Sequence, residues 1–266
     1  MTATTWLITG ANRGCGLAYV KLLLAQQSTT VVAAVRKPPL SEGLQSMQQA
    51  HGDRLKVVSL EATSAESVEA AAAEVGRDIG ALDYIVNNAG IIGTGELDFG
   101  VATEDQAAEP LESIERCFSV NTLGPLLVTR AFLPLLLKGN KKTVVNISSG
   151  SGVVTWRQQA AAASEPAPIV FKHGIGYAMS KAALQMQTAA LGAQLKEHGL
   201  IFISMDPGWM DTGLGRQGGK ICDLFKLRGD PPSAEDSAQG QIEVISGLTP
   251  ADNGKFLNFH GEPNPF

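Results

Sequence analysis

The feature that most constrains this chain is a glycine-rich turn close to its N-terminus. Residues 5–9 form an apolar, β-favouring run that leads into Gly10, Gly14 and Gly16, and an apolar helical pattern begins at Leu17. A strand, a glycine loop and a helix in this order can place backbone N–H groups and a helix N-terminus against a pyrophosphate. The alternative is a strand-to-helix turn that binds no ligand, because the spacing differs from the common Gly-x-Gly-x-x-Gly.

Composition excludes several classes of protein. The net charge of −5 and the pI near 5.4 argue against nucleic acid or an anionic membrane as a partner. No basic segment followed by an apolar run begins the chain, and the apolar run at residues 131–137 is broken by Pro134 and too short for a bilayer. Three isolated cysteines favour a reducing compartment, and four histidines lack metal-ligand spacing. We therefore expect a soluble, cytoplasmic protein without a structural metal.

Strand-like and helix-like segments alternate along the whole chain. The predicted strands are 30–35, 55–60, 82–86, 143–147, 201–205 and 255–258, after the first at 5–9. One helix is predicted directly after the glycine loop, and a second ends near residue 50. Further helices are predicted at 63–77, 111–137, 177–198 and 234–246. Near-continuous apolar strands are typical of a parallel sheet covered on both faces. The prediction is α/β, a Rossmann-like doubly wound parallel sheet in a single domain, residues 1–266, with ligands at the carboxyl ends of its strands.

One helix carries a pair of groups suited to proton transfer. Tyr177 and Lys181 are four residues apart and so share a helix face. A free Tyr titrates near ~10, and a neighbouring ammonium favours the phenolate, so Lys181 is expected to lower the pKa of Tyr177. Ser149, at the end of the preceding strand, offers a hydroxyl for a substrate carbonyl. Asn121 is a polar residue in an otherwise apolar helix.

These motifs together resemble the classical short-chain dehydrogenase/reductase family over nearly the whole chain. The glycine motif runs from Thr9 to Gly16, and Asn-Asn-Ala-Gly covers residues 87–90. The family's catalytic Asn, Ser, Tyr and Lys match Asn121, Ser149, Tyr177 and Lys181, and its Pro-Gly-x-x-x-Thr element matches Pro207, Gly208 and Thr212. The segment 252–262 resembles the carbonyl-reductase branch, often called sniffer- or C-factor-like.

The resemblance implies a role for each matched residue. Tyr177 would protonate the developing alkoxide and Ser149 would hydrogen-bond it. Lys181 would depress the Tyr pKa and hold the nicotinamide ribose, while Asn121 would hold a relay water. Residues 207–212 would seat the carboxamide, residues 88–90 would line the adenosine ribose, and Glu61 replaces the usual Asp beside the adenine. The implied cofactor contacts are Gly10, Asn12, Arg13, Gly14, Cys15, Gly16, Leu17, Arg36, Glu61, Ala62, Asn88, Ala89, Gly90, Tyr177, Lys181, Pro207, Gly208, Met210 and Thr212.

The second strand indicates NADPH rather than NADH. An NAD enzyme typically has an acid at the end of this strand for the ribose hydroxyls, but residues 31–40 contain none. Arg36 stands 20 residues beyond Gly16, and Arg13 lies in the glycine loop. A guanidinium can form charge-assisted bonds to a 2′-phosphate. The alternative is that both arginines are ordinary surface cations.

The chain departs from the family between Ser149 and Tyr177. These residues are 28 apart, and the family usually bridges them with a much shorter loop. We predict that residues 152–174 form a substrate-covering loop, in which Trp156 and Phe171 offer apolar area and Glu165 and His173 can titrate. The alternative is a surface loop packed away from the pocket.

Four residues have two interpretations each. The second of two adjacent serines, Ser149, fits the family register better than Ser148. Cys15 is interpreted as a small filler of the loop rather than a redox group. Trp209 is either a core plug or a wall of the substrate site, and Arg130 is interpreted as a solvated surface cation.

Three functions remain open from the sequence. The first is an NADPH-dependent carbonyl reductase acting on a ketone or aldehyde. The second is an imine or iminium reductase of a natural-product alkaloid pathway, with the inserted loop shaping a cyclisation. The third is a non-enzymatic NADPH sensor. The presence of both Tyr177 and Lys181 argues against it, because a pure sensor does not need this pair. The resemblance also implies a homo-oligomer, a dimer or tetramer paired through two long helices.

Overall fold

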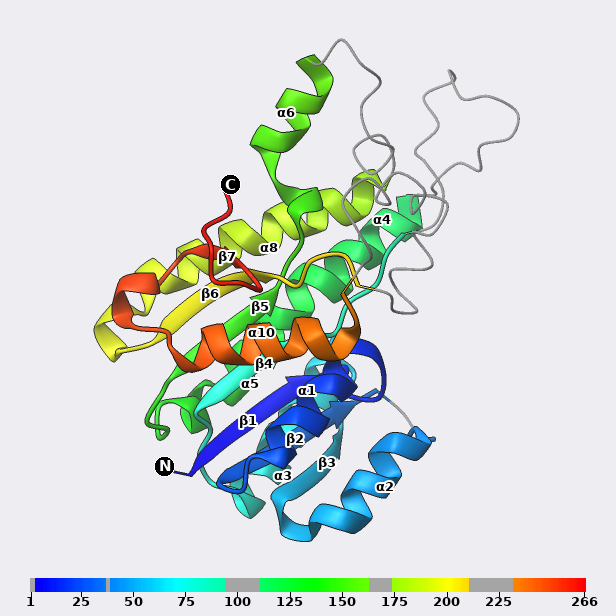
Figure 1. Ribbon diagram of the computed structural model, residues 1–266, viewed down its shortest axis with the longest axis vertical. Coiled ribbons are helices and arrows are strands. Elements are labelled where there is room, and N and C mark those ends of the chain that lie inside the picture. The colour runs from blue at the N-terminus through cyan, green and yellow to red at the C-terminus, as the bar shows by residue number, and fades with distance from the viewer. Residues whose placement is uncertain (1–2, 37–38, 94–110, 163–173, 211–231) are drawn as a thin grey trace.

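One parallel sheet organises the computed structural model, which describes residues 3–36, 39–93, 111–162, 174–210 and 232–266 (Figure 1). The strand order is β3-β2-β1-β4-β5-β6-β7, and every pairing between neighbours is parallel. The order reverses direction between β1 and β4, where doubly wound sheets bind ligands. The strands are β1 (Thr4–Thr9), β2 (Thr29–Val35), β3 (Leu55–Ser59), β4 (Tyr84–Asn87), β5 (Thr143–Ile147), β6 (Ile201–Asp206) and β7 (Phe256–Asn258).

Helices alternate with these strands, which confirms the predicted fold class. They are α1 (Gly14–Ala25), α2 (Glu42–His51), α3 (Ala65–Asp78), α4 (Leu111–Phe118), α5 (Gly124–Leu136), α6 (Val154–Ala162), α8 (Ile175–Gln194) and α10 (Ala234–Ser246). The predicted helix 111–137 is interrupted by a π-helical turn, Ser119–Leu123, between α4 and α5. Helix α6 lies in the segment predicted as a loop, and it projects away from the sheet (Figure 1).

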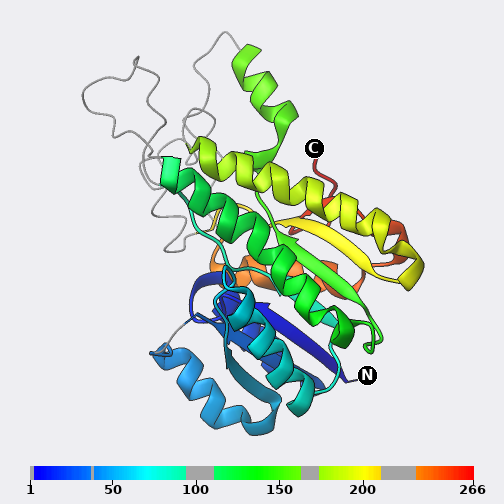
Figure 2. The ribbon, with the colours of Figure 1, turned by 180° about the vertical axis from the view of Figure 1, so that it is seen from behind.

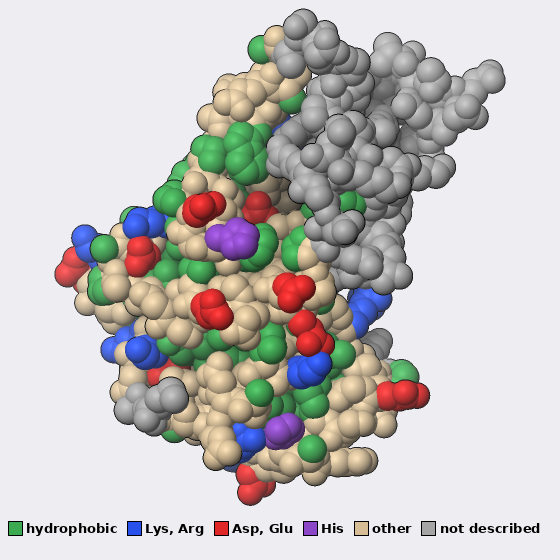
Figure 3. All heavy atoms as spheres, viewed as in Figure 1, with side chains coloured by type: hydrophobic (Ala, Val, Ile, Leu, Met, Phe, Trp, Pro, Cys, Tyr) green, Lys and Arg blue, Asp and Glu red, His purple; other side chains and the backbone are tan. Residues whose placement is uncertain are grey.

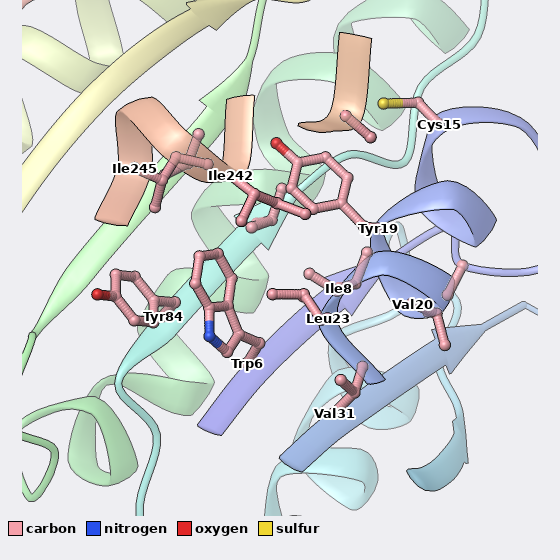
Figure 4. Close-up of a cluster of buried hydrophobic side chains, with 14 of the residues drawn as sticks. Trp6, Ile8, Cys15, Tyr19, Val20, Leu23, Val31, Tyr84, Ile242 and Ile245 are labelled. Carbon is pink, nitrogen blue, oxygen red and sulfur yellow. The ribbon is translucent and has the colours of Figure 1, made fainter. Parts of the chain in front are cut away.

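Each face of the sheet has its own hydrophobic core. One core joins alternate strand residues to the apolar sides of α1, α2 and α10, and Figure 4 shows Trp6, Tyr19, Leu23 and Ile242 within it. The Trp6 and Tyr84 rings stack there with centroids 3.9 Å apart. The other core joins the remaining strand residues to α3, α5 and α8, which cover the sheet in the view from behind (Figure 2). Helices therefore cover both faces of the sheet, as continuous apolar strands require.

Side-chain caps fix where several helices begin. Ser41 accepts from the Leu44 N–H at the start of α2, and Ser64, one of the two predicted caps, accepts from Ser67 at the start of α3. Ser233 and Asp236 form a capping box on α10. These bonds satisfy N–H groups that lack a partner within the helix.

The stretch Leu111–Leu136 is long and apolar enough to cross a membrane by length and composition. About half of its apolar window is buried inside this fold. It packs on α3 and α8 as a core helix, which explains its apolar character. On the face seen in Figure 3, Lys and Arg side chains are scattered among Asp and Glu side chains.

Candidate active site

The glycine loop is tightly closed between β1 and α1. Gly10 adopts φ +67°, and a Cβ at Gly16 would overlap the Gly10 carbonyl oxygen and come within 2.6 Å of Asn88 Nδ2. The Asn88 amide donates to the Thr9 carbonyl at 2.8 Å, and the Thr9 hydroxyl accepts from the Asn88 and Ala89 N–H groups. The side chain of Asn88, a residue expected to line the ribose, is therefore used in hydrogen bonding that stabilises the glycine loop. The backbone can turn this closely only because glycine carries no side chain.

Other predicted contacts in this region are spread around the loop. The Cys15 side chain points into the core (Figure 4), and burial raises the pKa of its thiol to about 12, as expected for a filler. Asn12 accepts from the Ser41 N–H at 2.7 Å and so ties the loop to the start of α2. Gly14, also at positive φ, begins α1, Leu17 is half-buried, and Arg13 is exposed as the N-cap residue. Arg13 is thus free to face a ligand at the loop.

A pocket of about 480 Å³ lies at the outer end of this edge. Arg36 and Glu61 share it and approach to 3.8 Å, so the predicted phosphate-binding cation and the predicted adenine-side acid are neighbours. Ala62 is buried beside Gly124. Residues from α4 and the π-turn complete the pocket; the whole lining is Arg36, Glu61, Thr63, Glu112, Glu115, Arg116, Ser119 and Val120.

Ser149 rather than Ser148 faces Tyr177. The side chain of Ser149 is hydrogen-bonded to the Tyr177 phenol. Ser148 is buried, donates to the Lys181 carbonyl at 3.3 Å and accepts from Gln185 at 3.1 Å. The two serines point to opposite faces because successive residues of an extended chain alternate. This geometry agrees with the choice made from the register of the sequence.

The ammonium of Lys181 lies over the ring of Tyr177. Its Nζ is 5.6 Å from the centre of the Tyr177 ring and donates to the Ile147 carbonyl at 2.7 Å. A Cβ on Gly90 would lie 3.7 Å from this Nζ and 3.3 Å from Asn121 Oδ1. The absence of a side chain at Gly90 therefore leaves room for Asn121, whereas the ammonium would lie at an ordinary contact distance.

The protonation of this pair differs from the expectation. Burial raises the pKa of Tyr177 to about 12, and the hydrogen bond with Ser149 opposes that effect. The pKa of Tyr177 is thus raised and not lowered as expected, because desolvation of the phenolate outweighs the other influences. Burial also lowers the pKa of Lys181 to about 8. Near neutral pH the phenol keeps its proton and most of the lysine remains charged.

The Asn121 side chain makes three hydrogen bonds with protein groups. It lies in the π-turn, accepts from the Ile91 N–H at 2.9 Å, and donates to the Ile91 carbonyl and to the Ser180 hydroxyl at 2.9 and 3.0 Å. These bonds fix the segment after β4 against the helix that carries Tyr177 and Lys181. Both Nδ2 hydrogens are used, so this side chain can hold the expected relay water only through the second lone pair of Oδ1.

The Pro207–Gly208 turn follows β6. The Pro207 carbonyl accepts from Ser237 of α10 at 2.6 Å, and Gly208 adopts φ +70° against the Phe259 ring. Trp209 and Met210 are half-buried, and Met210 packs on the core beside α1. Thr212 lies outside the described residues, as do Glu165, Phe171 and His173 of the predicted loop. Among the described residues, no three His, Cys, Asp or Glu side chains form a metal-binding group.

Sequence reasoning missed a set of polar side chains under this site. Asn87 donates to Asn146 at 2.8 Å, and Asn146 donates to Thr188 at 2.9 Å, which joins β4, β5 and α8 by side chains. Asp206, the last residue of β6, was also missed. Its position before Pro207 was the available signal, since a carboxylate at a strand end on the ligand-binding edge is a candidate site residue.

Comparison with known proteins agrees with the fold and the motifs. Residues 4–164 match the family model described as short chain dehydrogenase. The chain is 34% identical to a short chain dehydrogenase, gsfK, of Penicillium aethiopicum, covering 97% of both chains. It is 31% identical to the short-chain dehydrogenase/reductase atnB of an Arthrinium species, covering 98% of this chain and 99% of the relative.

A solved structure gives the same result. The NADPH-bound carbonyl reductase from chicken fatty liver is 30% identical, covers 100% of both chains and superimposes with a TM-score of 0.79. The match covers the whole chain, so it includes every strand of the sheet. The chain belongs to the short-chain dehydrogenase/reductase family of oxidoreductases, in its classical, carbonyl-reductase branch.

Proposed function

We propose that this protein is an NADPH-dependent carbonyl reductase that acts on a ketone or aldehyde of an organic molecule. The observation that carries the proposal is the contact between Ser149 and Tyr177, with Lys181 behind the phenol. These groups lie at the carboxyl edge of β5, on the same edge as the glycine loop. A carbonyl oxygen placed between the hydroxyl and the phenol would have two donors.

The chain fits the cofactor that the fold family uses. The glycine loop leaves no space for a Cβ at Gly16 and leads directly into the N-terminus of α1, and the pocket at Arg36 can receive the far end of a dinucleotide. Arg36 and the exposed Arg13 are suited to a 2′-phosphate, because a guanidinium forms charge-assisted bonds with it. The chicken relative is described as NADPH-bound.

The protein's own groups then have defined tasks. When bound, the reduced nicotinamide supplies a hydride for the carbonyl carbon. Tyr177 donates its proton to the carbonyl oxygen, as its raised pKa keeps it neutral, and Ser149 hydrogen-bonds the same oxygen. Lys181 stabilises the phenolate left behind, since a cation close to a phenolate lowers its free energy.

Turnover of cofactor tests the proposal. Purified protein is mixed with NADPH and a panel of aldehydes, ketones and cyclic imines, and the loss of NADPH absorbance is followed together with product identity. Reduction of carbonyl compounds is expected. Consumption of NADPH with cyclic imines alone would favour an imine or iminium reductase. Binding of NADPH without turnover of any compound would favour a non-enzymatic NADPH sensor.

Assembly into a homo-oligomer is a further part of the proposal. Leu123 and Leu126 are exposed along the α4–α5 stretch, and Met179 and Met186 are exposed on α8, which packs against α4. Apolar side chains grouped on neighbouring helices favour burial against a second copy. Light scattering would then give a mass above one chain, and Met186→Glu would reduce it, while Val154→Glu on α6 would not.

A further inference from the structure

Asp206 occupies a position that the mechanism above does not use. It ends β6, which pairs with β5 in the register Ile147 to Met205, and the Ser148 N–H donates to the Met205 carbonyl at 2.7 Å. Continuing this register places Asp206 opposite Ser148, next to the turn of Ser149 and Gly150 at the ligand edge of the sheet. It also directly precedes the Pro207–Gly208 turn.

One carboxylate accepts hydrogen bonds from three segments. The Gly208 N–H donates to Oδ1 at 3.1 Å, and Asn264 Nδ2 donates to Oδ2 at 3.4 Å. The N–H of Gly150, the residue after Ser149, is the third donor. Gly150 starts the turn that carries Ser149, and Gly208 belongs to the turn expected to seat the carboxamide. The carboxylate thus holds the substrate side and the cofactor side of the site together.

The charge of Asp206 also acts on the proton-transfer pair. Burial is the main influence on the pKa of Asp206 and raises it, while the N–H donors and the charge of Lys181 act to lower it. The negative charge in turn raises the pKa of both Tyr177 and Lys181. An anion close to an acid opposes loss of its proton, so Asp206 favours the protonated form of both groups.

Other titratable groups lie on the elements that surround Tyr177 and Lys181. Cys117 of α4 is buried and acts in the same direction as Asp206, raising the pKa of both Lys181 and Tyr177. Arg157 of α6 is held to the Ser151 carbonyl at 3.0 Å. The charged or titratable side chains of α10 and of the segment after β7 are exposed; they are Glu235, Asp236, Glu243, His260 and Glu262. Among the residues that the structure describes, Asp206 is the acid that accepts from both turns.

We propose that Asp206 is a positioning residue, which holds the Ser149 turn against the Pro207–Gly208 turn and whose negative charge keeps the Tyr177–Lys181 pair protonated. The inference rests on the proposed carbonyl reductase activity. A neutral side chain at this position would hold both N–H groups less strongly than the Asp206 carboxylate does, because hydrogen bonds to a charged acceptor are the stronger ones.

Asp206→Asn tests the inference, since it keeps the shape and removes the charge. Two readouts are followed: the NADPH dissociation constant by cofactor fluorescence, and the pH dependence of kcat for the best carbonyl substrate of the panel. Cofactor affinity is expected to fall roughly threefold to tenfold, because charge-assisted bonds are lost. The alkaline limb of kcat is expected to move to lower pH by about half a unit to one unit.

Asp83→Asn is the matched control. Asp83 is a buried carboxylate with three donors, as Asp206 has, in this case the backbone N–H groups of Thr5, Asn140 and Lys141, but it precedes β4 at the opposite edge of the sheet. This variant should lose thermal stability and keep the NADPH affinity and the pH limb of the wild type. If Asp206→Asn behaves in the same way, Asp206 is only structural and the inference is overturned.

Asp206→Glu covers the case in which Asp206→Asn does not fold. It keeps the charge on a longer arm, so the pH limb should stay at its wild-type place while NADPH affinity falls. A wild-type affinity, or a displaced limb, would contradict the inference. The affinity measurement needs no substrate, so it stands even if the panel yields no carbonyl reduction, which would instead refute the proposed function.

Discussion

The ammonium of Lys181 lies over the ring of Tyr177, 5.6 Å from its centre, and its proton is directed to the Ile147 carbonyl at 2.7 Å. The phenol has a different partner, the hydroxyl of Ser149. Helix spacing places the two residues on one side of α8, but β5 decides where each proton points. The arrangement keeps a neutral phenol next to a cation, which suits donation of a proton to a carbonyl oxygen.

Tyr177→Phe removes the proposed proton donor and retains the ring. We expect reductive kcat to fall roughly 10²–10⁴-fold, the usual range for loss of general acid catalysis, with little change in NADPH affinity. Steady-state kinetics and cofactor titration measure both. Tyr84→Phe is the control, because Tyr84 is a buried phenol stacked on Trp6 at the core. Near-wild-type reduction of ketones by Tyr177→Phe would show that another group supplies the proton.

The pH dependence of reduction should follow Lys181. Burial lowers its pKa from the ordinary value of 10.5 to about 8, so its charge is complete below that pH and is lost as pH rises through it. Tyr177, with a pKa of about 12, stays protonated over this range. We expect kcat to fall as pH passes about 8. Lys181→Arg keeps its charge, and its residual activity should lack this limb; a wild-type limb above pH 10 would contradict the assignment.

Arg36 should set the preference for NADPH. Arg36→Asp is expected to reduce kcat/KM for NADPH roughly tenfold to hundredfold, the equivalent of losing charge-assisted bonds, and to leave NADH unaffected or better used. Arg130→Asp is a close control, since both arginines are exposed and lie 3.8 Å from a glutamate. Equal wild-type efficiency with the two cofactors, or an unchanged preference in Arg36→Asp, would mean that Arg36 does not read the phosphate.

Trp156 should affect large substrates more than small ones. It comes from α6, and its ring lies so close to Gly150 that a Cβ there would overlap it, which places an apolar surface next to the Ser149 turn. In Trp156→Ala we expect KM to rise for a bulky aromatic ketone and to change little for a small aldehyde. Val154→Ala, an exposed position on the same helix, should alter neither. Equal effects on both substrates would place Trp156 outside substrate recognition.

Much of the fold could be predicted from the sequence because its signals are local. The strand predicted at 143–147 is β5, and the helix predicted at 234–246 is α10. Apolar runs define strands, and glycine or serine marks where they end. The interruption of the long helix at Asn121 and the helix α6 were missed, because neither has a local pattern that differs from an ordinary helix or a loop.

The candidate site divides in the same way. The identity of Ser149, Tyr177 and Lys181 follows from their order and spacing in the chain, because strand ends and helix faces obey simple periodicities. Their protonation does not, since it depends on how much water the folded chain removes from each group. The sequence by itself determined which groups meet at the carboxyl edge of the sheet. Only the tertiary structure decided that burial raises the pKa of Tyr177, that the Asn121 side chain is hydrogen-bonded to Ile91, and that Asp206 joins two turns. The reason is that these properties arise from contacts between segments far apart in the chain.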